Sequence, residues 1–333
     1  MTTKTTRRIW MTQAAAGALT LAGCSSAPSG AAKAPGGNGG FKLGLVYFAP
    51  EEGADTCMKG LFDSLKAQGI EEGKNLEVRR AHAQAEIANI PLLIQNYDNQ
   101  DVDAIVTLTT PCLTAACSMA KKKPVVFTYV YDPIAAGAGT SKSNHLPRIT
   151  GVGSFPPVED TIDVIQKLIP GIKSVGTLYN NSEANSNKVV GVAREAFTKR
   201  GIKLEEITAN STGEVFQAAQ VLTHRNVQAL WVTGDNTALQ SFDGIVKASR
   251  DAKLPLIIND PEFTQRGAVA SVGLGWNDAG QAAGKLVARI LRGESPQNIP
   301  FEEVAVKKVV LNNEVAQKLG LKFPAELIKE AQG

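Results

Sequence analysis

From residue 41 onward, short apolar runs alternate with longer stretches in which apolar positions recur every three or four residues. The short runs are apolar at consecutive positions, which is typical of strands buried on both faces. We therefore predict buried strands at Leu43–Phe48, Ala104–Leu108, Val125–Val130, Val175–Tyr179, Ala229–Val232 and Pro255–Ile258. Trp231 lies inside one of these runs, so we expect it in the core.

The longer stretches predict amphipathic helices. In 277–292, for example, the apolar residues fall at steps of three and four and form one face. The predicted helices cover 54–68, 86–99, 184–200, 214–225, 236–252 and 277–292. Strands that alternate with helices indicate an α/β fold with a parallel sheet covered by helices on both sides.

A weak internal repeat indicates that this unit occurs twice. Lys42–Phe48 resembles Ser174–Asn180, and Gln68–Ile70 resembles Arg200–Ile202, both at an offset of 132 residues. We therefore predict two similar doubly wound lobes joined by a hinge. The first lobe is expected to contain 41–152 plus about 276–300, and the second 153–275 plus about 301–333.

The N-terminus resembles an export signal. Lys4, Arg7 and Arg8 precede a short apolar stretch that ends in Leu21-Ala22-Gly23-Cys24, which resembles a lipobox. We predict a lipoprotein-type signal peptide at 1–23, lipidation of Cys24, and a flexible Gly/Ser/Ala/Pro-rich tether at 24–40. The body is then anchored outside the cytoplasm, on the periplasmic side or at the cell surface. The choice of membrane and of the twin-arginine or general export route stays open, and a buried N-terminal helix is the alternative interpretation.

Charge and metal-binding residues narrow the possible functions. The chain carries 35 basic and 32 acidic residues, and three of the basic ones lie in 1–23, so the body has no net charge. This balance gives no electrostatic case for binding nucleic acid. The three histidines, His82, His145 and His224, are far apart, and the cysteine spacings do not fit a zinc site, so we expect no metal.

Three cysteines follow the tether. Cys112 and Cys117 would lie on nearly opposite sides of a helix at 111–121, so they cannot bridge each other without distortion. Two alternatives stay open: a disulfide from Cys57 to one of them, or three free buried thiols.

The predicted topology places function at the loops that follow the strands, because ligands of open parallel sheets bind beyond the carboxyl ends of the strands. These loops are rich in hydroxyl, amide, carboxylate and aromatic side chains, although such residues also serve as ordinary turn and N-cap residues. The candidate ligand-binding residues are Tyr47, Phe48, Thr109, Thr110, Tyr131, Asp132, Tyr179, Asn180, Asn185, Ser186, Asp235, Asn236 and Asp260.

We assign expected roles by chemistry. Backbone N–H groups near 184–186 and at Asn236 suit a carboxylate. The carboxylates of Asp132, Asp235 and Asp260 suit an ammonium group or hydroxyls. The aromatic side chains suit a flat ring, with Trp276 as a further candidate beside the tyrosines and Phe48.

Sequence motifs give no indication of catalysis. A dinucleotide enzyme needs Gly-x-Gly-x-x-Gly after its first strand, and Leu45–Pro50 lacks it. There is no Gly-x-Ser-x-Gly and no nucleophile with an evident base. We expect neither enzymatic activity nor a cofactor.

Several segments, taken in order, resemble one family. They are Thr109–Ala116, Val125–Pro133, Ile149–Gly153, Leu178–Ser186, Thr233–Thr237, Arg266–Ala268 and Leu311–Asn313. From Phe41 to about Leu321 the chain resembles the tryptophan/tyrosine-type substrate-binding proteins of ABC transporters. The resemblance implies a type I periplasmic-binding fold with three hinge crossings, no catalytic step, and a permease and ATPase as partners.

The resemblance also guides the ligand and the mechanism. Relatives bind aromatic amino acids, but Asn180-Asn181 and the first loop depart from the family pattern, so the ligand need not be an amino acid. We predict capture of a small aromatic ligand, an aromatic amino acid or a related aromatic acid, between lobes that rotate about Thr150–Ser154, Gly273–Trp276 and Ile299–Phe301. We expect a monomer that contacts the membrane only through its lipid. The alternative is a lipid-anchored sensor that reports ligand occupancy to a signalling partner.

Overall fold

A computed structural model describes residues 40–304 and 306–332. The predicted signal peptide, Cys24 and the tether before residue 40 lie outside the described residues. Two six-stranded sheets account for the strands of the described part, and both belong to one compact unit.

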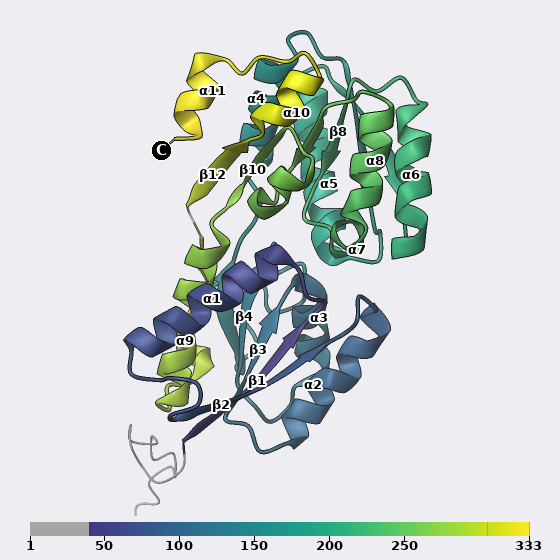
Figure 1. Cartoon of the computed structure of the whole chain (residues 1–333). Helices are drawn as coiled ribbons and strands as arrows, with labels where there is room; N and C mark the ends of the chain where they lie inside the picture. The colour runs from purple at the N-terminus through teal and green to yellow at the C-terminus, as the bar shows by residue number, and fades with distance from the viewer. Residues whose placement is uncertain (1–39, 305, 333) are drawn as a thin grey trace, which may run out of the picture. The chain divides into compact units, whose positions relative to one another are not determined.

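The first sheet has the strand order β11-β5-β4-β3-β1-β2, and every neighbouring pair is parallel. Helices α1 and α9 pack on one face, and α2 and α3 pack on the other (Figure 1). The strands are β1 (Phe41–Tyr47), β2 (Leu76–His82), β3 (Ala104–Leu108), β4 (Val125–Val130), β5 (Ile149–Gly153) and β11 (Glu302–Glu303). The helices are α1 (Glu52–Ala67), α2 (Ile90–Asn99), α3 (Thr110–Met119) and α9 (Trp276–Leu291).

The second sheet repeats this plan in the order β12-β10-β9-β8-β6-β7, with β12 antiparallel to β10. The strands are β6 (Ser174–Tyr179), β7 (Lys203–Thr208), β8 (Ala229–Val232), β9 (Leu256–Ile258), β10 (Ala270–Leu274) and β12 (Lys307–Leu311). The helices are α4 (Val158–Leu168), α5 (Ala184–Lys199), α6 (Val215–Thr223), α7 (Asn236–Gln240), α8 (Phe242–Asp251), α10 (Asn313–Lys318) and α11 (Ala325–Glu330). The prediction of two similar doubly wound lobes is confirmed.

The sequence pattern located the central strands but not the edge strands. β3 and β4 are buried at every position, which explains their continuous apolar runs. The edge strands β2 and β7 alternate with charged residues because one face of each meets solvent. The helix predicted at 236–252 is two helices, because the chain turns at Ser241 between α7 and α8.

The chain passes between the sheets three times, after β5, after β10 and after β11. The first two passages fall at or beside the predicted hinges, but the third follows Glu303 rather than lying at Ile299–Phe301. Ile299 and Phe301 are buried in the first lobe, where the Ile299 carbonyl accepts a hydrogen bond from Thr150 at 2.8 Å. The Phe301 ring also packs edge-on against Phe127, at 4.9 Å between centroids.

The pair formed by α1 and α9 is packed through glycines. A Cβ atom at Gly280 would lie 1.9 Å from the Cys57 carbonyl oxygen, and one at Gly284 would lie 2.5 Å from the Leu61 carbonyl oxygen. Only glycine permits this backbone approach. The helix that follows the second passage is thereby fixed to the first lobe.

The three described cysteines are free. Cys57 belongs to the core beneath α1 and Cys112 to the core beneath α3, on opposite faces of the first sheet. Burial raises the pKa of both thiols to about 12. Of the two alternatives from the sequence, free thiols agree with this structure.

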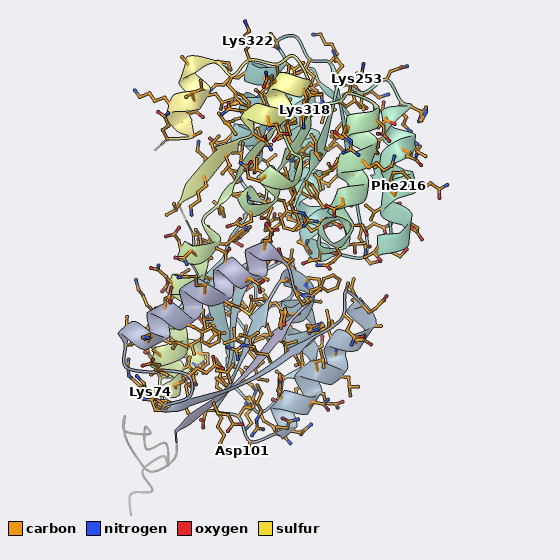
Figure 2. All side chains as sticks on the ribbon, viewed as in Figure 1. Lys74, Asp101, Phe216, Lys253, Lys318 and Lys322 are labelled. Carbon is orange, nitrogen blue, oxygen red and sulfur yellow. The ribbon has the colours of Figure 1, made fainter. Side chains whose placement is uncertain are left out.

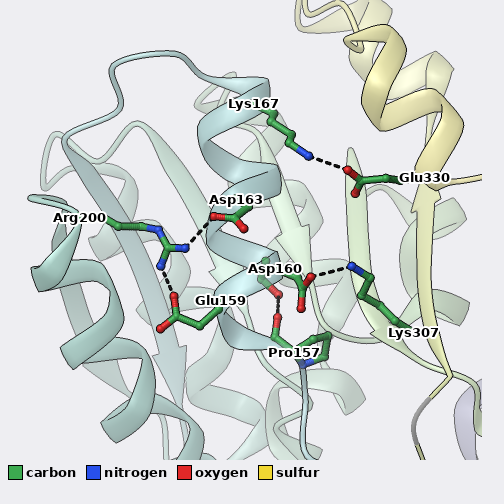
Figure 3. A network of polar contacts seen from close by, with 9 residues as sticks. Pro157, Glu159, Asp160, Asp163, Lys167, Arg200, Lys307 and Glu330 are labelled. Carbon is green, nitrogen blue, oxygen red and sulfur yellow. Dashed lines mark hydrogen bonds and ion pairs between the residues drawn. The ribbon is translucent and has the colours of Figure 1, made fainter.

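Ion pairs fix the C-terminal segment to α4 of the second lobe (Figure 3). Lys167 contacts Glu330 of α11 at 2.6 Å, and Asp160 contacts Lys307 of β12 at 2.6 Å. Arg200, directly after α5, pairs with Glu159 and Asp163 of α4. Such exposed pairs contribute up to about 1 kcal/mol each, so packing supplies most of the attachment.

Candidate functional site

Charged side chains mark the amino end of each sheet, and Lys74, Asp101 and Lys253 project outward from loops that precede strands (Figure 2). The carboxyl ends of the strands are different: many of the residues that follow them are buried, and hydrogen bonds at Asp260 and Gly234 join the two lobes there. The candidate site lies at these ends.

Two tyrosines of the first lobe bond directly to the second. The Tyr129 hydroxyl donates to Asp260 Oδ2 at 2.8 Å, and the Tyr131 hydroxyl accepts from the Gly234 N–H at 2.9 Å. Tyr129 sits where the register of β4 shifts and has φ of +58°, which is unusual for a bulky residue. Thr109, before α3, also has a positive φ, of +81°. Backbone strain of this kind concentrates at ligand sites.

Two small cavities remain between these contacts. Thr110, Tyr129, Tyr131, Asn185 and Gly234 contribute to one, and Phe48, Ala49, Glu51, Thr109 and Gln240 to the other, while both share Asn236 and Leu239. Each encloses about 10 Å³, which is close to the space of one water molecule. A larger ligand can therefore enter only when the lobes separate.

Larger hollows of about 480 and 490 Å³ lie elsewhere, along β1 and β2 and along β7 and α6. Both are open surface depressions at the edge strands, and no set of functional side chains converges on them. We therefore place the site at the small cavities, despite their size in this conformation.

Several buried polar atoms in or near the loops that follow the strands have no hydrogen bond of ordinary geometry among the described residues, and those of Thr109 and Asn185 belong to residues that line the cavities. They are Thr109 Oγ1, Asn185 Oδ1, Thr233 Oγ1, Asp260 Oδ1, Glu262 Oε2 and Trp276 Nε1. An unsatisfied buried polar group costs about 1–3 kcal/mol, so such groups are uncommon away from functional sites. Their concentration here indicates a place for ligand atoms.

Three carboxyl groups, of Glu51, Asp260 and Glu262, gather beside Tyr129. The Glu51 carboxylate caps α1 by accepting the N–H groups of Gly53 and Ala54, at 2.8 and 2.5 Å. Burial, together with the charge of Asp260, raises the pKa of Glu51 to about 8 and that of Glu262 to about 8. Burial likewise raises the pKa of Asp260. The acid cluster, as we call these three residues, has no basic residue among its ion pairs in the described structure.

An aromatic surface adjoins the acid cluster. The Trp276 indole is buried and meets the Tyr129 ring edge-on at 4.3 Å between centroids. Trp276 begins α9, directly after the second passage between the lobes. From the sequence we expected Trp276 to contact a ring of the ligand. In this structure it contacts a ring of the protein itself.

Two further carboxylates organise the loops of the second lobe. Asp235 accepts hydrogen bonds from Asn180 N–H at 2.7 Å, Ser186 Oγ at 2.6 Å and Ala238 N–H at 2.7 Å. Burial, and secondly the charge of Glu183, raises the pKa of Asp235 to about 7. Asp235 is therefore a positioning residue in this structure.

The Glu183 side chain lies at the N-terminus of α7. It accepts the N–H groups of Asn236 and Thr237 at 3.1 and 3.0 Å, and the Asn185 amide at 3.1 Å. The N–H group of Asn236, which we expected to hold a ligand carboxylate, is therefore already used by the protein.

The predicted site residues fall into three groups by position. The cavities are lined by Phe48, Thr109, Thr110, Tyr131, Asn185 and Asn236, and Asp260 reaches them through Tyr129. Asn180, Ser186 and Asp235 form the hydrogen-bonded layer behind. Three others bond elsewhere: Tyr47 packs on His82, Tyr179 donates to Glu206, and Asp132 accepts N–H groups within its own turn.

The sequence analysis missed Tyr129, Glu51, Glu183 and Glu262 as functional candidates. Tyr129 was hidden inside the apolar run of β4, and Glu51 lies one residue beyond the loop that we singled out. The available signal for Glu51 was its place before α1, since an acidic N-cap after a strand points to the carboxyl end of the sheet.

The described residues contain no group of three or more His, Cys, Asp or Glu side chains suited to a metal ion. No helix in the same residues is long and apolar enough to cross a membrane.

Comparison with known proteins adds independent information. A family model described as ABC transporter substrate binding protein matches residues 42–333. The tyrosine-binding protein of Clostridioides difficile (strain R20291) is 26% identical over 288 residues, which cover 86% of this chain and 83% of that protein.

Two solved structures are similar along nearly their whole length. The ABC domain of a Streptococcus pneumonia protein in complex with L-Trp has a TM-score of 0.84 and 27% identity, covering 88% of this chain and 98% of that one. The ligand-free, open structure of an adhesive substrate-binding protein from Clostridium difficile has a TM-score of 0.65 and 25% identity, covering 86% and 96%. The TM-score is higher for the L-Trp complex than for the ligand-free, open structure.

Proposed function

Because the chain belongs to the family of ABC transporter substrate-binding proteins, we propose that it captures a small aromatic ligand between its lobes and delivers it to an ABC permease. Proteins of this family bind small molecules outside the cytoplasm and are not enzymes. The observation that supports a ligand at this place is the set of unpartnered buried polar atoms around Tyr129, Tyr131 and Trp276.

An aromatic amino acid is the first candidate ligand. The relatives named above are a tyrosine-binding protein and a protein crystallised with L-Trp. In this chain, Trp276 and Tyr129 supply ring surfaces, and the neighbouring carboxyl groups supply hydrogen-bond acceptors. A ring that enters between the lobes can take the place that Tyr129 now fills against Trp276.

Delivery depends on a change between open and closed lobes. The three passages of the chain after β5, β10 and β11 are the hinge candidates. A ligand shifts the lobes toward closure only by the contacts that it makes with both of them. The two cavities at the candidate site enclose about 10 Å³ each, so a larger molecule enters them only when the lobes separate.

We extend the proposal to the cellular setting. Lipidation of Cys24 and the tether at 24–40 would hold a monomeric body at the membrane, with the permease and its ATPase as partners. The alternative of a lipid-anchored sensor finds no support in the family, whose described role is transport.

Binding and thermal unfolding measured on the purified chain test the proposal, with aromatic amino acids, other aromatic acids and sugars as ligands. We expect an aromatic compound to bind with a dissociation constant near 1 μM, about −8 kcal/mol. At one hundred times that concentration it should stabilise the folded state by about 2.7 kcal/mol. Stabilisation by a sugar alone would contradict the aromatic ligand, and a covalent product would contradict the non-catalytic role.

A further inference from the structure

The acid cluster contains more carboxyl oxygens than the protein itself uses as hydrogen-bond acceptors. Glu51 follows β1 and Asp260 follows β9, so the two carboxyl groups come from the carboxyl ends of different sheets. Asp260 is fully buried; one of its oxygens bonds to Tyr129, and the other has no hydrogen bond of ordinary geometry, with Trp276 and Glu262 as its side-chain neighbours. Glu262, on the same loop, interacts with Asp260 and has one oxygen without a hydrogen bond of ordinary geometry.

Among the residues that the structure describes, no basic side chain forms an ion pair with these groups. Lys308 is the one cation whose charge acts on Glu262, and it is 42% exposed and lies 3.9 Å from Asp278. A buried carboxylate without a cation is costly, so the isolated cluster favours protonated carboxyl groups. A ligand cation would allow them to ionise.

Backbone N–H donors at the same place are largely used already. Gly53 and Ala54 donate to Glu51, Asn236 and Thr237 donate to Glu183, and Gly234 donates to Tyr131. The helices α1 and α7 therefore do not offer their N-termini to a ligand anion. Of the unpartnered atoms, the oxygens of Asn185, Asp260 and Glu262 are acceptors, the Thr109 and Thr233 hydroxyls can donate or accept, and Trp276 Nε1 donates.

Two buried oxygens outside the acid cluster support this reading independently. Thr109 is 4% exposed and Asn185 is 2% exposed, and Thr109 Oγ1 and Asn185 Oδ1 have no partner. Thr109 lines the same cavity as Glu51, and Asn185 lines the adjoining one. The Asn185 oxygen is purely an acceptor, so it requires a donor from the ligand.

We propose that the acid cluster is a subsite for a protonated amine, that Glu51 is its specificity-determining residue, and that the positive charge of the ligand contributes more to binding than a carboxylate does. This inference rests on the proposed function, because it names the charged group of the ligand that enters the same site. The ligand class is an aromatic amine, with or without a carboxylate.

A matched ligand series separates the two charged groups. Calorimetry on the full chain compares tyrosine with tyramine, which lacks the carboxylate, and with 3-(4-hydroxyphenyl)propionate, which lacks the amine; the tryptophan series is measured in the same way. Loss of the amine should weaken binding by about 100-fold or more, and loss of the carboxylate by about 10-fold or less. Tight binding of the acid together with failure of the amine would overturn the inference and leave the aromatic ligand standing.

A variant assigns the effect to Glu51. Glu51→Gln keeps one of the two acceptor oxygens that cap α1 and cannot pair with a cation, so it should weaken binding of the amines by about 100-fold and leave the acids unchanged. Glu52→Gln is the matched control, since Glu52 is exposed in the same turn and should bind as wild type. If Glu51→Gln does not fold, Asp260→Asn provides the same comparison. Amine affinities that are unchanged in a folded variant would overturn the inference.

An aliphatic amine and an aliphatic acid test the amine subsite without an aromatic ring. If no aromatic compound binds, the proposed function fails in its ligand class, and thermal shifts with propylamine and propionate then decide the subsite. Stabilisation by the amine alone upholds it, whereas stabilisation by neither or by the acid overturns it.

Discussion

The Tyr131 hydroxyl lies 2.9 Å from the Gly234 nitrogen and connects the end of β4 in the first lobe to the loop after β8 in the second. The contact leaves no space for a side chain, because a Cβ atom at 234 would stand 1.9 Å from that hydroxyl oxygen. Closure of the lobes at this point therefore depends on a glycine.

Gly234→Ala is expected to oppose closure without unfolding either lobe. The added methyl group clashes only when the lobes meet, so binding of the ligand should weaken by about 10-fold or more. Small-angle scattering with and without ligand, together with calorimetry, measures the effect.

Gly191→Ala is the matched control for that substitution. Gly191 lies in α5, and a Cβ atom there meets nothing within 4 Å. Alanine should stabilise the helix by up to about 1 kcal/mol and leave binding unchanged. Equal binding by both variants would show that the contact at 234 does not control closure.

Asp235→Ala is expected to destabilise the second lobe. Its carboxylate accepts hydrogen bonds from Asn180, Ser186 and Ala238. The substitution therefore removes a helix cap and leaves buried donors without an acceptor. We expect a loss of about 3 kcal/mol in the free energy of unfolding. From the sequence we expected Asp235 to contact the ligand instead.

Urea unfolding measures that loss, with Asp243→Ala as the control. The Asp243 side chain is 81% exposed and pairs with Arg266, so its removal should cost less than about 1 kcal/mol. A stable Asp235→Ala protein with weakened binding would restore Asp235 to the ligand-contact group.

Stability of the ligand-free protein should fall as the pH rises from about 4.5 to about 8. The pKa of Glu51 is raised from 4.5 to about 8, so the folded state binds a proton that the unfolded state has lost in this range. Glu262 and Asp235 act in the same direction. Each such proton contributes up to about 1.4 kcal/mol per pH unit.

Thermal unfolding between pH 5 and pH 8.5 checks this sign. Glu51→Gln should flatten the dependence, because the amide does not titrate, whereas Glu52→Gln should leave it in place. A melting temperature that rises with pH across this range would contradict the burial of protonated carboxyl groups.

Thiol reactivity should follow burial. Cys57 and Cys112 are buried with pKa values of about 12, and Cys117 is partly exposed with a pKa of about 11. At pH 8 we expect slow labelling of Cys117 alone among the three, and labelling of all three in denaturant. Peptide mapping by mass spectrometry reports each site, and protection of Cys57 that persists in denaturant would indicate a disulfide instead.

The sequence predicted the parts of the fold in which burial is complete. β3, β4 and β8 are buried at every position, so their continuous apolar runs predicted strands correctly. Trp231 is in the core as expected, and its indole N–H donates to Asn259. The edge strands β2 and β7 were not predicted, because the charged residues on their exposed faces give these segments the composition of a loop.

The site was predicted less completely because its residues depend on tertiary geometry. Nothing local marks the strained backbone of Tyr129 or directs its hydroxyl to Asp260. Asp235 looked like an accessible loop carboxylate, yet its bonds turn it into the interior of the second lobe. Strand order brings the right loops together, but it does not specify which atoms remain free for a ligand.

The glycine contacts between α1 and α9 join two segments that are far apart in the sequence, so the ribosome makes α1 long before α9. When a ribosome has reached residue 275, it has supplied every strand of the second sheet except β12, but neither α9 nor β11 of the first. A chain truncated there leaves β5 and β10 as bare edges, which are templates for aggregation. Both halves of the molecule thus reach their final form only after residues 276–311 have been synthesised.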